Sequence, residues 1–263
     1  NFSSPFLTPP IRAKRHPVRH LGRVVEVLGL RYLSSFFGEG IVMMEIIFVK
    51  NVNEKHTIKY RIIQAGDFQQ TVDLCSQIFT KYEPITKSLN INYQEFRQIA
   101  EPYCIKAIED RLSIVATDSN GQIVGFTISE HLMSQPPYLK DISYKFEPIQ
   151  ALSYDLKYSY SRSQYYLKLF QTLHILMVGV KEEYKNQKIA KTLIKENLKL
   201  AKINNFSVAI AEATGLISQN IFRSLGFKEE VIFLYNSYIF RGEEKFSSIK
   251  ESVGCALMSY SIF

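Results

Sequence analysis

The sequence contains no tryptophan, only three cysteines, and no apolar run close to the roughly 18–20 residues that cross a bilayer. Cys75, Cys104 and Cys255 lie far apart, in apolar contexts and without the spacing of metal ligands. Such cysteines are typical of reduced core residues in an intracellular protein. We therefore expect no membrane span and no bound metal.

Basic residues are in excess but form no dense block after residue 50. The formal net charge is +7, and the lysines are scattered over predicted helix faces. This distribution favours a solvated surface over a nucleic-acid surface, with some attraction for small anions. We expect no nucleic-acid partner.

Residues 1–42 differ in composition from the rest of the chain. They contain five arginines against one lysine, whereas residues 43–263 contain six arginines against 20 lysines. We interpret 1–42 as a basic N-terminal extension, which could contact a larger assembly, and 43–263 as one domain. An arginine-rich, acid-poor leader is typical of a mitochondrial presequence. A plain extension or a wrong gene start would give the same pattern, and the protein would then be cytoplasmic.

Residues 171–201 form the pattern around which the chain is organised. Gln171–Val180 is a continuous apolar run, which predicts a buried strand. Ile189–Ala201 places apolar side chains at helical spacing with lysines on the other face, which predicts an amphipathic helix. A short polar turn joins the two. Backbone amides at a helix N-terminus favour a phosphate anion, so this stretch is a candidate anion site.

Strands and helices alternate along the rest of the chain, which indicates an α/β fold. Asp67 is the expected N-cap of the first helix, and Asn120-Gly121 is the expected turn of a hairpin. We expect further strands at 57–64, 206–213, 231–240 and 255–263, a hairpin at 112–131, and helices at 67–82, 93–109, 150–160 and 218–225. Loops are expected at 83–90, 133–150 and 241–251.

The turn after the apolar run carries a more specific pattern. Val180 is followed by Tyr184-Lys185, then by Ile189-Ala190 and Leu193. This spacing resembles the acetyl-CoA signature of the GNAT acetyltransferase superfamily. The resemblance covers roughly residues 57–263. It implies the GNAT acyl-CoA N-acyltransferase fold, a mixed central sheet flanked by helices, with acetyl-CoA as co-substrate.

The same resemblance implies which residues hold acetyl-CoA. The end of the strand would pair its backbone with the pantetheine arm, the turn would hold the pyrophosphate, and Lys191 would reach the ribose phosphate. The strand residues are Met177, Val178, Gly179 and Val180, and the turn residues are Lys185, Asn186, Gln187, Lys188, Ile189 and Ala190.

Lys188 departs from the signature, which usually has glycine at this position. Glycine lets the backbone approach the pyrophosphate closely and adopt unusual dihedral angles. Either Lys188 has a negative φ with its side chain in solvent, so that the amides still converge, or it blocks the loop. We expect the first.

Three segments outside the signature resemble the insect-type arylalkylamine (dopamine-like) N-acetyltransferases. They are Phe79–Leu89, Ala213–Phe227 and Tyr238–Phe246. An amine attacks a thioester only as the neutral base, so its proton must pass to a group such as a carboxylate. In the resembled subgroup the glutamate of a Glu-Pro pair is this base, which implies a catalytic role for Glu83. The alternative is a solvated loop glutamate.

The departing CoA thiolate takes up a proton. The tyrosine that the wider superfamily often uses is replaced by Phe222, and the hydroxyls of the resembled subgroup fall on Thr214 and Ser218. Ser218 is equally suited to cap the short helix that follows, and thiolates leave readily without an acid. His174 lies inside the apolar run and fits a core or cleft histidine better than a catalytic one.

These features predict an N-acetyltransferase that transfers acetyl from acetyl-CoA to a small primary amine, such as an arylalkylamine, by direct attack. Neither Cys75 nor Cys104 has a base partner at recognisable spacing, so we expect no covalent enzyme intermediate. One alternative is a binding or structural subunit on a GNAT scaffold, favoured by Lys188 and Phe222. Another is a protein or peptide acetyltransferase, and an ordered insert within residues 133–166 would argue against it.

Overall fold

The strands of the protein form one mixed sheet in the order β1-β2-β3-β4-β5-β6-β7-β8-β10-β9. The computed structural model describes residues 26–27, 30–35, 43–53, 56–162 and 166–262, with side chains described from residue 57 onward except 163–167. Neighbouring strands are antiparallel except β7 and β8, which are parallel. The strands are β1 (Glu26–Val27), β2 (Leu30–Ser35), β3 (Met43–Asn53), β4 (His56–Ile62), β5 (Ile114–Thr117), β6 (Ile123–His131), β7 (Thr172–Val180), β8 (Val208–Ala213), β9 (Lys228–Leu234) and β10 (Gly254–Ser261).

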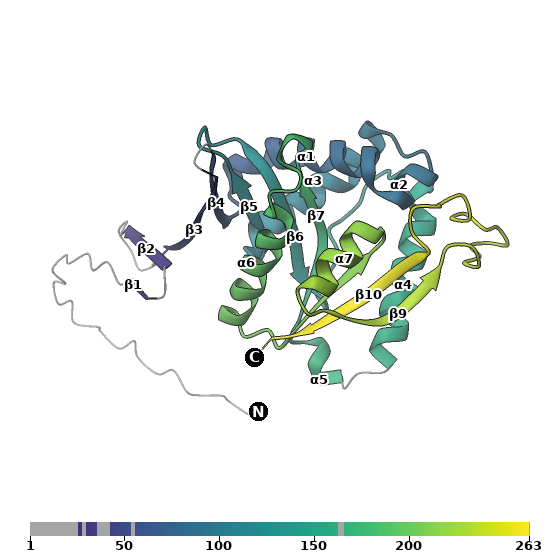
Figure 1. Cartoon of the computed structure of the whole chain (residues 1–263). Helices are drawn as coiled ribbons and strands as arrows, with labels where there is room; N and C mark the ends of the chain where they lie inside the picture. Colours follow the sequence, from purple (N-terminus) through teal and green to yellow (C-terminus); the bar gives the residue numbers. More distant parts are fainter. Residues whose placement is uncertain (1–25, 28–29, 36–42, 54–55, 163–165, 263) are drawn as a thin grey trace, which may run out of the picture.

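Helices cover both faces of this sheet, as Figure 1 shows. The α-helices are α1 (Phe68–Tyr82), α2 (Pro84–Ser88), α3 (Tyr93–Asp110), α4 (Glu147–Arg162), α5 (Tyr166–Leu169), α6 (Ile189–Ile203) and α7 (Leu216–Ser224), and the short 3-10 helices are η1 (Ala65–Asp67), η2 (Tyr144–Phe146) and η3 (Glu182–Tyr184). The predicted α/β fold with a mixed central sheet flanked by helices is confirmed.

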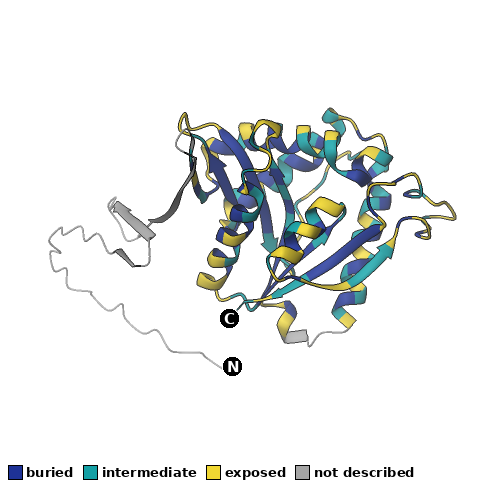
Figure 2. Cartoon of the chain, in the orientation of Figure 1, coloured by how far each residue is buried: buried dark blue, intermediate teal, exposed yellow. Residues whose placement is uncertain are grey.

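Alternation along the strands divides the core into two faces. On β7, Leu173 and Ile175 pack with α6 and α7, and we call this side the α6 face. His174 points to the other side, which α1, α3 and α4 cover and which we call the α4 face. Figure 2 shows the resulting pattern, with buried residues along the strands and exposed residues on the outer sides of the helices.

The first helix is positioned by a buried ion pair rather than by a side-chain cap. Asp67 precedes α1, as expected, but its carboxylate makes no capping hydrogen bond to the helix. It accepts instead from the guanidinium of Arg61, at 2.5 and 2.7 Å, and from the backbone amide of Gln64 at 2.8 Å. The pair joins the end of β4 to the start of α1.

Three predicted boundaries are wrong. The expected loop at 83–90 contains the helix α2, and the expected loop at 133–150 contains η2 and the start of α4. The strand expected over 231–240 ends at Leu234. After Leu234 the chain buries Tyr235, Tyr238 and Phe246 against the α4 face from an irregular segment. Apolar residues therefore continue past the end of β9, which is why the pattern predicted a longer strand.

The division into residues 1–42 and 43–263 stays a prediction, because most of residues 1–42 lie outside the described part of the chain. Within the described ranges no helix is long and apolar enough to cross a membrane.

Candidate active site

Strand β7 loses its partner β8 halfway along its length. The parallel ladder pairs Thr172–Ile175 with Val208–Ala211 and ends there, although β7 continues to Val180. On its other edge β7 remains paired with β6 up to Val180. The second half of β7 therefore has one edge that β8 does not cover in the described ladder. The residues predicted for the pantetheine arm, Met177, Val178, Gly179 and Val180, all lie on this open edge.

A bulge explains why the ladder ends at this point. The register between β6 and β7 shifts so that Ile128 faces Met177 while Ser129 faces Ile175, which leaves Leu176 as an extra residue. Leu176 and Met177 both pack against the core of the α4 face, although they are consecutive. Such a bulge bends its strand, and it lies immediately after the last β7–β8 pair.

Gly179 is required by packing on the α4 face. A Cβ at this position would lie 2.6 Å from Cζ of Phe126 and 3.0 Å from Cδ1 of Ile78. Only glycine lets the open half of β7 lie this close to α1 and β6.

The turn before α6 has the backbone shape of a glycine-containing loop. Lys188 is the N-cap residue of α6 and has φ 61° and ψ 18°, in the left-handed region. The expectation of a negative φ is therefore wrong. For a residue with a Cβ this conformation costs about 1–2 kcal/mol. The side chain of Lys188 is exposed, so it does not fill the loop.

The N-terminus of α6 carries no group of its own that satisfies its amides. Lys188 makes no side-chain cap, and the first turn contains no acidic residue. The first amides of a helix have no partner within it and attract anions. Asn186 precedes this end with φ 62°, Gln187 and Ala190 are partly buried, and Ile189 is buried against β6.

Two of the three lysines predicted to contact phosphates, Lys185 and Lys191, are held by other groups. Nζ of Lys185 lies 2.8 Å from a carboxylate oxygen of Glu182 and 4.3 Å from the ring centroid of Tyr82. Nζ of Lys191 donates to the carbonyl of Ser224, at the end of α7, over 3.3 Å. Their roles in binding the pyrophosphate and the ribose phosphate stay predictions.

Glu83 connects α1 to α2 as a helix cap. Its two carboxylate oxygens accept from the amides of Ile85, at 3.0 Å, and Thr86, at 2.6 Å. Pro84 at the first position of α2 fits this geometry, because its missing N–H would have no partner there. Glu83 is half-buried, so it is neither a core residue nor the fully solvated loop glutamate of the alternative interpretation.

Thr214 and Ser218 lie at the turn between β8 and α7. The hydroxyl of Ser218 donates to the carbonyl of Gly215 at 2.8 Å and accepts from its amide at 3.2 Å. Ser218 therefore takes part in the cap of α7, but as the third helical residue bonded back to the N-cap Gly215 and not as the first residue of the helix. Its catalytic role and that of Thr214 stay predictions. A Cβ on Gly215 would lie 3.4 Å from the ring of Pro84, so this turn lies beside the start of α2.

Tyr235 is a residue that the sequence analysis missed. It is 1% exposed, and its hydroxyl donates to the carbonyl of Thr214 at 2.7 Å. Burial raises the pKa of this phenol, and the carboxylates of Glu83 and Glu251 add to the effect after the Cys255 thiol. Tyr235 thus ties the β8–α7 turn to the α4 face beside Glu83. Nothing in the pattern of the predicted strand at 231–240 distinguishes it from its neighbours.

Two other predicted features have clear positions. Phe222 is 4% exposed and packs edge-on against Phe227, with ring centroids 4.9 Å apart, so the α6 face has an apolar ring where the superfamily's acid would be. His174 is 1% exposed on the α4 face, as expected for a core or cleft histidine.

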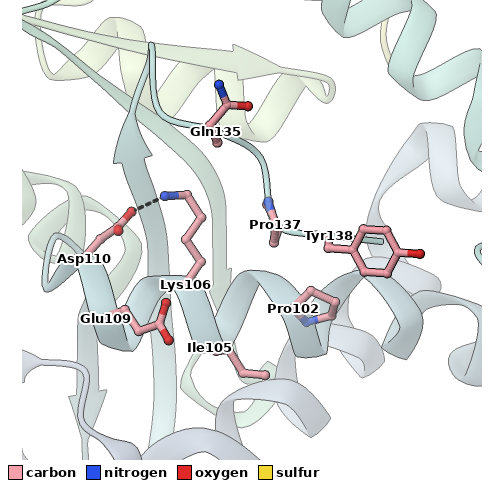
Figure 3. A pocket seen from close by; sticks show the side chains of 8 residues that line it. All are labelled: Pro102, Ile105, Lys106, Glu109, Asp110, Gln135, Pro137 and Tyr138. Carbon is pink, nitrogen blue, oxygen red and sulfur yellow. Dashed lines mark hydrogen bonds and ion pairs between the residues drawn. The ribbon is translucent and has the colours of Figure 1, made fainter. Parts of the chain in front are cut away.

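Two surface hollows are lined by residues outside this arrangement. One, of about 360 Å³, lies between α3 and the segment that contains Pro137 and Tyr138. Figure 3 shows the side chains that line it, among which Lys106 and Asp110 form an ion pair. The other, of about 530 Å³, lies between the end of α2, the start of α4 and the segment around Arg241. In the described part of the chain, no group of three or more metal-ligating side chains is placed to hold a metal ion.

Comparison with known proteins agrees with the fold and the signature. Residues 82–227, more than half of the chain, match the model of the Acetyltransferase (GNAT) family. No curated protein sequence matches the chain.

Three solved structures resemble the protein over 78% of its length, and each is covered over 99% of its own. The first is arylalkylamine N-acetyltransferase 2 from Aedes aegypti, with 22% sequence identity and a TM-score of 0.67. The second is the C-terminal condensation domain of Ebony in complex with beta-alanyl-dopamine, with 18% identity and a TM-score of 0.70. The third is polyamine N-acetyltransferase from Drosophila melanogaster, with 12% identity and a TM-score of 0.55. At these identities the likeness establishes a shared fold.

Proposed function

Because the chain belongs to the GNAT acetyltransferase family, we propose that it transfers the acetyl group of acetyl-CoA to a small primary amine. Arylalkylamines are the first substrates to test, because three segments outside the signature resemble enzymes that use them. The observation that carries the proposal is the open edge of β7 beside the uncapped N-terminus of α6.

These two features fit the two chemically distinct parts of CoA. The open edge of Met177–Val180 offers backbone amides and carbonyls to the amide groups of the pantetheine arm. The first-turn amides of α6 offer donors to the pyrophosphate, and Lys185, Lys188 and Lys191 add positive charge close to them in sequence. Acetyl-CoA supplies an activated thioester, and the chain's role is to hold it against the attacking amine.

On the amine side, Glu83 is the proposed general base. It precedes Pro84, which lies beside the β8–α7 turn, and the residue as a whole is half-buried. The N–H bonds from Ile85 and Thr86 fix its orientation and leave other lone pairs on both oxygens. Through an intervening water, the carboxylate removes a proton from the ammonium group. The neutral nitrogen then attacks the thioester, and the thiolate of CoA departs.

A small substrate agrees with the ordered segment after β6. Residues 133–162 contain η2 and α4, and α4 packs against β9 and β10 on the α4 face. A protein or peptide substrate would need an open groove on this side instead.

The proposal is tested by binding and turnover together. Acetyl-CoA at 100 times its dissociation constant should stabilise the protein by about 2.7 kcal/mol, which appears as a rise in the melting temperature. Thiol release from acetyl-CoA should accompany the acetylation of an amine panel. An unchanged melting temperature at millimolar acetyl-CoA, with no thiol release, would rule the activity out.

Glu83→Gln tests the base. The amide keeps the size of the side chain and one acceptor oxygen, but it cannot take a proton. Turnover should fall by about 10²- to 10⁴-fold, and the acidic limb of the pH–rate profile should disappear. Glu109→Gln, at an exposed glutamate of α3 away from the proposed site, is the matched control and should keep the wild-type profile. Wild-type turnover in Glu83→Gln would remove Glu83 from this role.

A binding or structural subunit is the second candidate, and the left-handed backbone of Lys188 is the observation that favours it. Lys188→Gly relieves this strain and should raise the free energy of unfolding by about 1 kcal/mol. If the natural loop binds CoA, the affinity should change little, or fall mainly at low salt because a positive charge is lost. Calorimetric titration of both proteins distinguishes the candidates. Binding of CoA by the glycine variant alone would favour the binding subunit.

A further inference from the structure

Three polar side chains from adjacent strands meet at the centre of the α4 face. They are Glu130 of β6, His174 of β7 and Glu212 of β8, which we call the Glu–His–Glu cluster. Nδ1 of His174 lies 3.4 Å from Oε1 of Glu130, and Nε2 lies 3.5 Å from Oε1 of Glu212. The imidazole is 1% exposed and each glutamate side chain 13%.

Hydrogen bonding in this cluster is incomplete. Both ring nitrogens of His174, Oε2 of Glu130 and Oε1 of Glu212 are buried without a hydrogen-bond partner among the described residues. A buried polar group without a partner costs free energy, and most folded proteins contain few of them. Here several acceptors converge with few donors, which is the complement of an alkylammonium group with its three N–H donors.

The groups that face the cluster leave it acidic. From α4, the ammonium of Lys157 approaches Glu212 at 4.0 Å. From α3, Tyr103 contributes a phenol whose pKa is raised by burial and then by Glu130 and Glu212. The two carboxylates of Glu130 and Glu212 therefore stand against the single ammonium of Lys157, which leaves an excess of carboxylate charge. A cation entering it would neutralise this charge in a region of low dielectric.

The cluster adjoins the open edge of β7. The β7–β8 ladder ends at Ile175 and Ala211, so His174 belongs to the last pair but one and Glu212 immediately follows the last pair. Burial raises the pKa of the Cys255 thiol, and the carboxylates of Glu212 and Glu83 raise it further. The charges of Glu83, the proposed base, and of Glu212 in the cluster therefore both affect the pKa of Cys255. Glu83 and the cluster lie on the same side of the sheet, around the place where the amine must meet the thioester.

We propose that the Glu–His–Glu cluster binds a second, cationic nitrogen of the amine substrate, so that the preferred substrates are diamines or other amines with a distant positive charge. This inference rests on the proposed acetyltransferase function and narrows its substrate class. One nitrogen is acetylated at the open edge, while the other donates hydrogen bonds to Glu130 and Glu212.

The experiment compares matched amines of equal chain length with the full chain and acetyl-CoA. The pairs are butylamine with 1,4-diaminobutane and hexylamine with 1,6-diaminohexane, which cover two spans between the nitrogens. The wild-type protein should prefer the diamine of at least one pair by about 10-fold or more in kcat/KM. Glu212→Gln and Glu130→Gln should each reduce this ratio by about 10-fold or more while leaving the monoamine kcat/KM within about 2-fold.

Two further variants make the result specific. Lys157→Met keeps the apolar stem but removes the competing ammonium, so it should increase the diamine preference. Glu196→Gln changes a buried glutamate of α6 that pairs with Lys199 on the other side of the sheet, and it should leave the ratio unchanged. Turnover of the monoamine shows in every case that the variant is folded.

A ratio near 1 for both pairs in the wild-type protein would overturn the proposal while leaving the acetyltransferase function intact. A diamine preference that survives both glutamine substitutions would place the cation site elsewhere and would also overturn it. Failure of the function itself gives a different result, because then no amine is acetylated and acetyl-CoA does not raise the melting temperature.

Discussion

Ser129 and Glu130 are neighbours on β6, yet they belong to two polar networks of opposite kind. Ser129 points to the α6 face, where its hydroxyl donates to Oδ1 of Asn197 at 2.5 Å. The amide of Asn197 in turn donates to the carbonyl of Leu112 at 2.7 Å. Glu130 points to the α4 face and joins His174 in the Glu–His–Glu cluster, where several buried atoms have no hydrogen-bond partner among the residues that the structure describes.

The difference distinguishes buried polar groups that stabilise the fold from buried polar groups that serve a function. A buried network whose members are satisfied stabilises one packing arrangement, and its loss is costly. A buried cluster that lacks donors is kept at a cost to stability, so it requires another explanation. Both networks are buried, and hydrogen bonding rather than burial distinguishes them.

The largest effect on stability is expected in the hydrogen-bonded network of Ser129 and Asn197. Asn197 is 0% exposed, so Asn197→Ala leaves the hydroxyl of Ser129 and the carbonyl of Leu112 without partners and opens a small cavity. The free energy of unfolding should fall by about 2–4 kcal/mol, measured by urea denaturation. Asn204→Ala, at the exposed end of α6, is the control and should cost about 1 kcal/mol or less. Equal losses in the two variants would contradict the structural role of the Ser129–Asn197 network.

An intermediate effect on stability is expected for the single hydrogen bond from the hydroxyl of Tyr235 on the α4 face. Tyr235→Phe removes only the hydroxyl that donates to Thr214 and should lower the free energy of unfolding by about 1 kcal/mol. Because the bond holds the β8–α7 turn beside Glu83, kcat should also fall. Tyr260→Phe, whose ring packs on Phe227, should change neither quantity appreciably. A loss of stability without any change in kcat would limit Tyr235 to a structural role.

The smallest effect on stability is expected in the Glu–His–Glu cluster. Glu130→Gln removes a buried negative charge and gives the cluster a donor, while the attraction for His174 is lost. These terms oppose each other, so the free energy of unfolding should change by about 0.5 kcal/mol or less. A loss above about 2 kcal/mol in the same urea experiment would show that the cluster stabilises the fold as strongly as the Ser129–Asn197 network does.

Local patterns in the sequence were sufficient for most of the fold. The apolar run of β7, the helical spacing of α6 and the Asn120-Gly121 turn are signals within a few residues of one another, and the elements were found at these places. The prediction of a loop at 83–90 was wrong because Pro84 suggested a bend. Proline at the first helical position is equally compatible with a capped helix.

The site was less accessible to prediction because its geometry depends on contacts across the sheet. Leu176 is one apolar residue in an apolar run, so nothing in the sequence predicts that it forms a bulge. The left-handed backbone of Lys188 is set by the loop and is unexpected for a lysine. Glu130, His174 and Glu212 come together only through strand register, over more than 80 residues of chain.

The bulge at Leu176 also determines which genetic changes can make β7 regular. Leu176 and Met177 face the same side of the sheet, so removing one of them would restore regular alternation without turning any later side chain to the wrong face. Substitutions in β7 change side chains but not the number of residues between Ile175 and Val178. The irregularity is therefore encoded by the number of residues in β7, and a one-codon deletion at Leu176 is the change that removes it directly.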